Sequence, residues 1–128
     1  MRIQESAENY LETILILSQG GKQVRSVDIS TELDYTKPSV SVAMKKLRLD
    51  GYIEVDSNGF ITLTNQGRNI AESMYERHTL ISGWLVSLGV DKQIAAEDAC
   101  RMEHVISEQS FVAIKDHIAN YKHKQDNS

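Results

Sequence analysis

Residues 26–64 decide the fold and read SVDISTELDYTKPSVSVAMKKLRLDGYIEVDSNGFITLT. Ser26 can cap a short helix, whose apolar residues recur at helical spacing until a tight turn at residues 34–37. A second helix is predicted over residues 38–50, because a proline is tolerated in its first turn and Gly51 is the residue type that most often ends a helix. This part of the stretch therefore predicts two helices joined by a tight turn.

The remainder of the stretch predicts a β-hairpin. Apolar and polar residues alternate in residues 52–55 and 60–64, around a turn at residues 56–59 that contains Asn-Gly. Residues 6–18 add an amphipathic helix before the quoted stretch. The order helix, helix, turn, helix, hairpin is that of a winged helix-turn-helix, which places its last helix in the major groove of DNA.

After the hairpin, the pattern is helical to the end of the chain. Helices are predicted over residues 65–88, 91–106 and 107–121, with Gly89 closing the first and Ser107 capping the last. The expected fold is mostly α-helical with a small β-hairpin. It comprises a winged helix-turn-helix over residues 1–64, a helical domain over residues 65–121 and a polar, frayed tail over residues 122–128.

The composition is that of a soluble globular protein. The 128 residues are 41% hydrophobic and 25% charged, and no apolar run approaches the roughly 20 residues that span a bilayer. The first residues carry acids where a signal peptide carries basic residues. A single cysteine, Cys100, excludes an internal disulfide framework and suits a reducing compartment. The expected location is the cytoplasm, with no membrane partner.

The charge distribution predicts a DNA-contacting helix, although the net charge is −4. Residues 35–49 carry three lysines and one arginine without a single acid, whereas residues 91–116 are mainly acidic. A solvated helix face or a protein-interaction winged helix would show a similar basic stretch. The candidate DNA-binding residues are Thr36, Lys37, Pro38, Ser39, Ser41, Lys45, Lys46 and Arg48.

A second group of residues predicts a metal site in the helical half. Cys100, Glu103 and His104 stand at i, i+3 and i+4, so they share one face of the predicted helix. Thiolate, carboxylate and imidazole are the usual protein ligands of first-row transition metals. The alternative is a buried cysteine beside a solvated Glu-His pair. His78 is a weaker candidate, because a single histidine on a helix is more often structural.

The chain resembles the diphtheria-toxin-repressor and manganese-transport-regulator family of metal-dependent repressors, and the resemblance extends from Ala7 to about His117. It implies a homodimer, a double-stranded DNA operator, no SH3-like domain, and a metal between the first helix and the dimerisation helices. The motifs that carry the resemblance are ENYLE at residues 8–12, PSVS at 38–41, the LT…GR join at 63–68, RH at 77–78 and ACRMEH at 99–104.

The resemblance also implies which residues bind metal. The primary site takes one residue from the first helix and three from the fifth, and a neighbouring site takes a glutamate of the first helix and a histidine of the fourth. The implied metal ligands are Asn9, Cys100, Glu103 and His104 for the primary site, with Glu12 and His78 for the neighbouring one.

Four positions depart from the family pattern. Asn9 stands where the manganese branch has aspartate and the iron branch methionine, and its neutral amide oxygen binds metal more weakly than a carboxylate. Ser82 and Ala96 replace ancillary ligands of the iron branch. Val105 replaces the second histidine of some manganese regulators. The chain is therefore expected to combine features of the iron branch and the manganese branch.

The ligand types set the expected metal and leave one alternative function. Fe(II) or Mn(II) is the expected physiological ion, with iron favoured by Cys100, while Zn(II), Co(II) or Ni(II) should bind in vitro. The expected operator is a palindrome that controls metal-homeostasis genes. The alternative is a metal-independent winged-helix regulator that senses oxidation through Cys100. No enzyme activity or small-molecule substrate is expected, because no general base accompanies the cluster in a recognisable motif.

Overall fold

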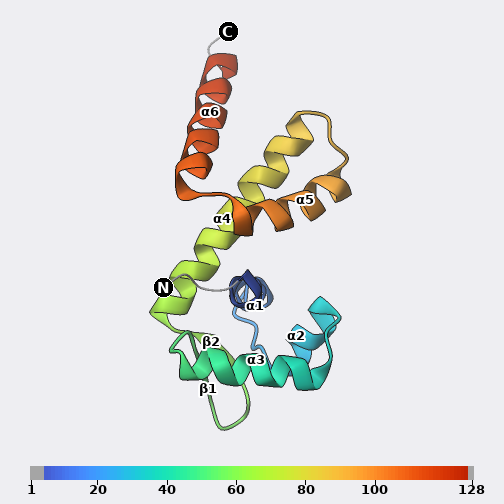
Figure 1. Cartoon of the computed structure of the whole chain (residues 1–128), viewed down its shortest axis with the longest axis vertical. Coiled ribbons are helices and arrows are strands. Elements are labelled where there is room, and N and C mark those ends of the chain that lie inside the picture. Colours follow the sequence, from blue (N-terminus) through green and yellow to red (C-terminus); the bar gives the residue numbers. More distant parts are fainter. Residues whose placement is uncertain (1–4, 127–128) are drawn as a thin grey trace. The chain divides into compact units, whose positions relative to one another are not determined.

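The computed structural model describes residues 5–126, with side chains described through residue 121. The chain forms two compact units that divide between Tyr75 and Glu76, within one continuous helix. In chain order, the elements are α1 (Glu5–Leu17), α2 (Ser26–Leu33), α3 (Lys37–Leu49), β1 (Ile53–Val55), β2 (Ile61–Leu63), α4 (Asn65–Ser87), α5 (Lys92–Val105) and α6 (Glu108–Asp126) (Figure 1).

The N-terminal unit is built around one apolar core. Three residues of α3, namely Val40, Met44 and Leu47, recur at helical spacing and are buried, so the apolar face of that helix packs into the core. The opposite face of α3 is exposed. The core residues of this unit are Leu11, Ile14, Val24, Ile29, Val40, Met44, Leu47, Ile53, Ile61 and Ala71.

The predicted hairpin is confirmed. β1 and β2 are antiparallel, with Val55 opposite Ile61. The Asp56 carboxylate accepts the backbone N–H groups of Asn58 and Phe60, each at 2.9 Å, which holds the turn in place. A third segment, which the sequence pattern did not predict, pairs with this small sheet. The N–H of Ile61 donates to the carbonyl of Val24 at 2.7 Å.

Two predicted helix boundaries are wrong. Ser26 is the first residue of α2 rather than its cap, and Arg25 stands at the cap position. The N–H of Arg25 donates to the Asp28 carboxylate at 2.9 Å, so an acid in the first turn closes this helix start from the other side. α6 continues to Asp126 instead of ending at about Tyr121, because residues 122–126 contain no glycine or proline that would end the helix. Residues 127–128 of the predicted tail lie outside the described residues.

The start of α4 is fixed against the hairpin by a close backbone approach. The Thr64 hydroxyl donates to the carbonyl of Gly51 at 2.7 Å and accepts the N–H of Gly67 at 3.2 Å. A Cβ at Gly67 would lie 2.0 Å from the carbonyl oxygen of Tyr52, so only glycine fits at this position. The sequence between the hairpin and α4 therefore fixes how the helix leaves the hairpin.

The C-terminal unit consists of the end of α4 together with α5 and α6, and α5 turns back beside α4 (Figure 1). Asp91 caps α5 by accepting the N–H of Gln93 at 3.1 Å, and Ser107 caps α6 by accepting the N–H of Ser110 at 3.1 Å, as predicted for the serine. The buried apolar residues of this unit are Ile81, Ala95, Ala99 and Phe111. None of the helices within the described residues is long and apolar enough to cross a membrane.

Candidate functional site

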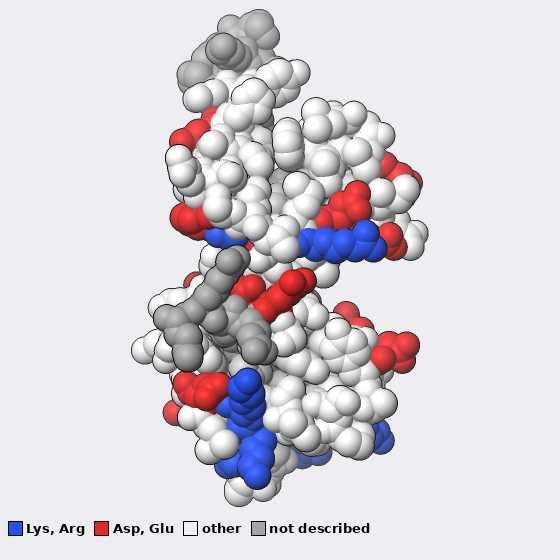
Figure 2. Space-filling view, in the orientation of Figure 1, with Lys and Arg blue, Asp and Glu red and all other residues white. Residues whose placement is uncertain are grey.

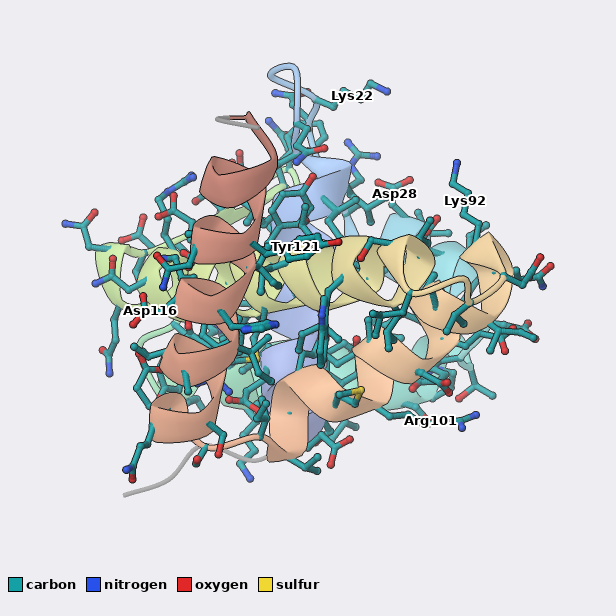
Figure 3. All side chains as sticks on the ribbon, turned by 90° about the horizontal axis from the view of Figure 1, so that it is seen from above. Lys22, Asp28, Lys92, Arg101, Asp116 and Tyr121 are labelled. Carbon is teal, nitrogen blue, oxygen red and sulfur yellow. The ribbon has the colours of Figure 1, made fainter. Side chains whose placement is uncertain are left out.

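The last turns of α5 bring together the three residues of the predicted metal cluster. The Cys100 Sγ, a carboxylate oxygen of Glu103 and a ring nitrogen of His104 all lie within 4.8 Å of one another. They share a helix face because they stand at i, i+3 and i+4. Arg101, the neighbour of Cys100, points away from the other helices of this unit (Figure 3). The three donor atoms therefore converge on one side of α5.

Burial distinguishes a metal site from the alternative of a core cysteine. Glu103 has no exposed surface and the His104 side chain is only 3% exposed, whereas Cys100 is exposed. The alternative required the opposite arrangement, with a buried thiol and a solvated Glu-His pair. A buried carboxylate is costly unless a positive charge or a metal compensates it. Sulfur, oxygen and nitrogen donors in this arrangement fit a divalent transition metal.

His78 on α4 faces the same carboxylate. Its Nδ1 lies 3.1 Å from the Glu103 Oε2, while the Glu103 Oε1 lies 3.3 Å from the His104 Nε2. When the Glu103 carboxylate is ionised it can only accept, so the Nδ1 of His78 is then the donor in this contact. The hydrogen bond to Glu103 raises the pKa of His78 above its ordinary value; partial burial opposes this rise, and the negative charge of Glu103 adds to it. Glu103 thus hydrogen-bonds His78 through Oε2, while its Oε1 lies close to the Nε2 of His104.

The raised pKa of His78 predicts a pH-dependent stability in the metal-free protein. The protonated ring stabilises the fold fully below the ordinary pKa of 6.5, and this contribution is lost as the pH rises through the raised folded-state pKa. NMR titration of the His78 ring in the presence of chelator measures the shift. The Glu103→Gln variant is the control, and its His78 pKa should fall below that of the wild type. A wild-type His78 that titrates at or below 6.5 would contradict this prediction.

The remaining predicted ligands, Asn9 and Glu12, lie on α1 in the N-terminal unit. They stand at i and i+3 and therefore share one face of that helix. The backbone carbonyl of Asn9 accepts the Thr13 hydroxyl at 2.8 Å, which involves the main chain of Asn9 and not its amide. The participation of both residues in a metal site stays a prediction.

The candidate DNA-binding residues cover the outer face of α3. All eight are exposed, and Lys and Arg side chains gather over this part of the N-terminal unit, at the bottom of the view in Figure 2. Thr36 has a structural task as well, because its hydroxyl accepts the N–H of Ser39 at 3.3 Å and caps the helix. Val42, which is not among the eight candidates, also lies on this outer face and is 71% exposed. Helical periodicity predicts this exposure, because Val42 lies two residues from each of the buried positions Val40 and Met44.

Comparison with known families identifies both halves of the chain. Residues 2–59 match the iron-dependent repressor N-terminal DNA-binding domain, and residues 64–128 match the iron-dependent repressor metal-binding and dimerisation domain. The chain belongs to the iron-dependent repressor family. This confirms the resemblance inferred from the sequence motifs, and with it a fold of a DNA-binding and a dimerisation domain. It also makes the chain a member of a family of metal-dependent transcriptional repressors.

Two relatives each share about one third of their residues with this chain over most of its length. The transcriptional regulator MntR of Escherichia coli O157:H7 is 33% identical over 112 residues, which are 88% of this chain and 72% of the relative. The iron-dependent repressor IdeR of Mycobacterium tuberculosis is 32% identical over 105 residues, which are 81% of this chain and 46% of the relative. Both are named as regulators or repressors and not as enzymes.

Two solved structures show the same fold. The manganese regulator SloR matches with a TM-score of 0.78 and 29% identity, over 94% of this chain and 55% of that one. A manganese-dependent transcriptional repressor in complex with manganese matches with a TM-score of 0.81 and 25% identity, over 88% of this chain and 52% of that one. The chain therefore spans about half the length of these two structures.

Proposed function

We propose that this chain is a homodimeric repressor whose binding to a palindromic DNA operator of metal-homeostasis genes depends on a divalent transition metal. The observation that carries the proposal is the convergence of Cys100, Glu103 and His104, with the carboxylate and the imidazole buried. The iron-dependent repressor family supplies the two expected modules, a DNA-binding and a metal-binding dimerisation domain. The DNA-contacting helix and most of the proposed metal ligands would therefore lie in different halves of the chain.

The proposed primary ligands are Cys100, Glu103 and His104 on α5, joined by Asn9 from α1. Glu12 and His78 would form a neighbouring site that shares Glu103, whose second oxygen already faces His78. A bound metal supplies a positive charge that compensates the buried carboxylate. Iron or manganese is the proposed physiological ion, since relatives are named for each. The thiolate favours zinc, cobalt or nickel in vitro, and a related regulator, ScaR, has a solved structure with bound Zn²⁺.

Homodimerisation is proposed through the C-terminal unit. Its buried apolar core is small, while several large apolar side chains of the same unit are exposed. Exposed apolar surface of this kind is typical of a face that another subunit covers. The exposed residues are Val86, Leu88, Ile94, Val105, Val112 and Tyr121.

DNA recognition is proposed through α3. Two copies of this helix in a dimer would enter successive major grooves, about 34 Å apart. Lys45, Lys46 and Arg48 would contact phosphates, and the exposed Val42 suits an apolar contact with a thymine methyl group. When donors of α1 and α5 bind the same ion, the orientation of the DNA-binding unit is restricted. This restriction would select the half-site spacing of the operator.

Metal-dependent operator binding tests the proposal directly. Fluorescence anisotropy with a palindromic duplex should show affinity about 5- to 150-fold higher with Fe²⁺ or Mn²⁺ than with excess chelator. Cys100→Ser protein should retain its DNA contacts but require more metal. Equal operator affinity of metal-saturated and chelated protein would contradict the proposal. Binding that responds to oxidant but not to chelator would instead favour the alternative of an oxidation sensor at Cys100.

A further inference from the structure

Arg77 is a charged side chain that the C-terminal unit buries, with 8% of the residue exposed. Its Nη1 donates to the backbone carbonyls of Glu103 and Ile106, at 3.2 and 2.7 Å. Its Nη2 donates to the Glu108 carboxylate at 2.8 Å, and its Cζ lies 5.2 Å from the centroid of the Phe111 ring. Through one side chain, α4 thus reaches both the last turn of α5 and the first turn of α6.

The position of this guanidinium suits the chemistry of a helix end. The last carbonyl groups of a helix have no partner within the helix, and the helix dipole makes this end negative. The carbonyl of Glu103 lies in the last turn of α5, and that of Ile106 lies just beyond it. The planar fork of Arg77 satisfies both carbonyls and an acid at once, which a lysine ammonium cannot reproduce with the same geometry.

The same turn of α5 carries the proposed metal ligands. Glu103 is held at two points by consecutive residues of α4, its carbonyl by Arg77 and its carboxylate by His78. His104 follows directly in the chain, so its backbone position depends on the same hydrogen bonds. Loss of the Arg77 contacts would free the end of α5 to move relative to α4.

We propose that Arg77 is a positioning residue of the metal site, which fixes the backbone of Glu103 and His104 so that their side chains converge without rearrangement. The inference rests on the proposed metal-binding function, and it adds a residue that is itself no ligand. Groups that orient metal ligands are worth about 10- to 100-fold in metal affinity. Arg77 should act on this scale.

Co²⁺ titration of the dimeric full chain tests the role of Arg77, because the visible absorption of bound Co²⁺ reports both affinity and ligand geometry. Arg77→Met should bind Co²⁺ about 10- to 100-fold more weakly than wild type, with an altered spectrum. Arg77→Lys keeps the charge, so its Co²⁺ affinity should lie between those of the wild type and Arg77→Met. It replaces Arg77→Met in the test if the methionine variant does not fold. Glu108→Gln is the matched control: it removes the ion pair but leaves both carbonyl contacts, and it should stay within about 3-fold of wild type.

Hydrogen exchange in the metal-free protein supplies a readout that is independent of metal. The Ile106 N–H, which donates to the carbonyl of Met102 at 3.0 Å, should exchange faster in Arg77→Met than in Glu108→Gln. Wild-type affinity and spectrum in Arg77→Met would overturn this inference alone. An equal loss in Glu108→Gln would overturn it too, because the ion pair would then be responsible. Wild-type protein that binds no Co²⁺ would contradict the proposed function and this inference with it.

Discussion

Glu103→Gln should lower the affinity for divalent metal by at least about 100-fold and abolish metal-dependent operator binding, because loss of a direct anionic ligand should cost no less than loss of an orienting group. Glu103 is the only residue of the described part whose two side-chain oxygens face His78 and His104 at once. The amide keeps the shape of the side chain but removes its charge and one acceptor oxygen. The proposed primary and neighbouring metal sites should both be lost.

The Glu103→Gln variant should remain folded without metal. This result would show that Glu103 acts as a metal ligand and is not required for folding. Glu103 has no exposed surface, so replacing its charge with an amide removes a desolvation cost as well as an interaction. Thermal unfolding with chelator at neutral pH should therefore stay cooperative, with a midpoint lowered by no more than the part of the His78–Glu103 stabilisation that remains at that pH. Isothermal titration calorimetry with Mn²⁺ and operator anisotropy measure the losses.

Glu97→Gln provides the matched control for this experiment. It makes the same chemical change on the same helix, at an exposed position. Metal affinity and operator binding should equal those of the wild type. Similar losses in Glu97→Gln and Glu103→Gln would show that the overall charge of α5, and not a ligand, controls the response. Retained metal affinity in Glu103→Gln would remove this residue from the site.

The parts that the sequence predicted well depend on neighbours along the chain. Cys100, Glu103 and His104 lie on one helix, so their spacing alone placed them on a common face. The hairpin could also be predicted from neighbouring residues, because an Asn-Gly turn between two alternating segments fixes the register of the strands that it joins. The inward face of α3 followed from helical periodicity in the same way.

What the sequence could not show depends on contacts between distant segments. The burial of Glu103 and the exposure of Cys100 depend on contacts between α5 and other elements, and no local pattern encodes which of the two residues is covered. Arg77 lies 26 residues from Glu103 and appeared only as part of a family motif. The bridge between Val24 and Ile61 likewise joins segments that lie far apart along the chain, with two helices and a strand between them. The ligand types were therefore predictable, but not the residues that position them.

Gly67→Ala should destabilise the N-terminal unit by about 1–3 kcal/mol, although alanine is the better helix former by about 1 kcal/mol. The added Cβ would lie 2.0 Å from the Tyr52 oxygen and 3.0 Å from its carbonyl carbon. These are backbone atoms that cannot rotate away as a side chain can. The Tyr52 oxygen also accepts the N–H of Thr64 at 3.1 Å, so a shift that relieves the overlap would strain that hydrogen bond.

Gly83→Ala in the same helix separates this steric effect from helix propensity. Gly83 has no atom within 4 Å of its hypothetical Cβ, so alanine there should stabilise the protein by about 0.5–1 kcal/mol. Chemical denaturation of both variants at equal protein concentration, with chelator present, measures the difference. Because the overlap at Gly67 lies between α4 and the hairpin, its variant should also bind operator more weakly with saturating metal. Two variants of equal stability would mean that α4 can leave the hairpin without the close contact at Tyr52.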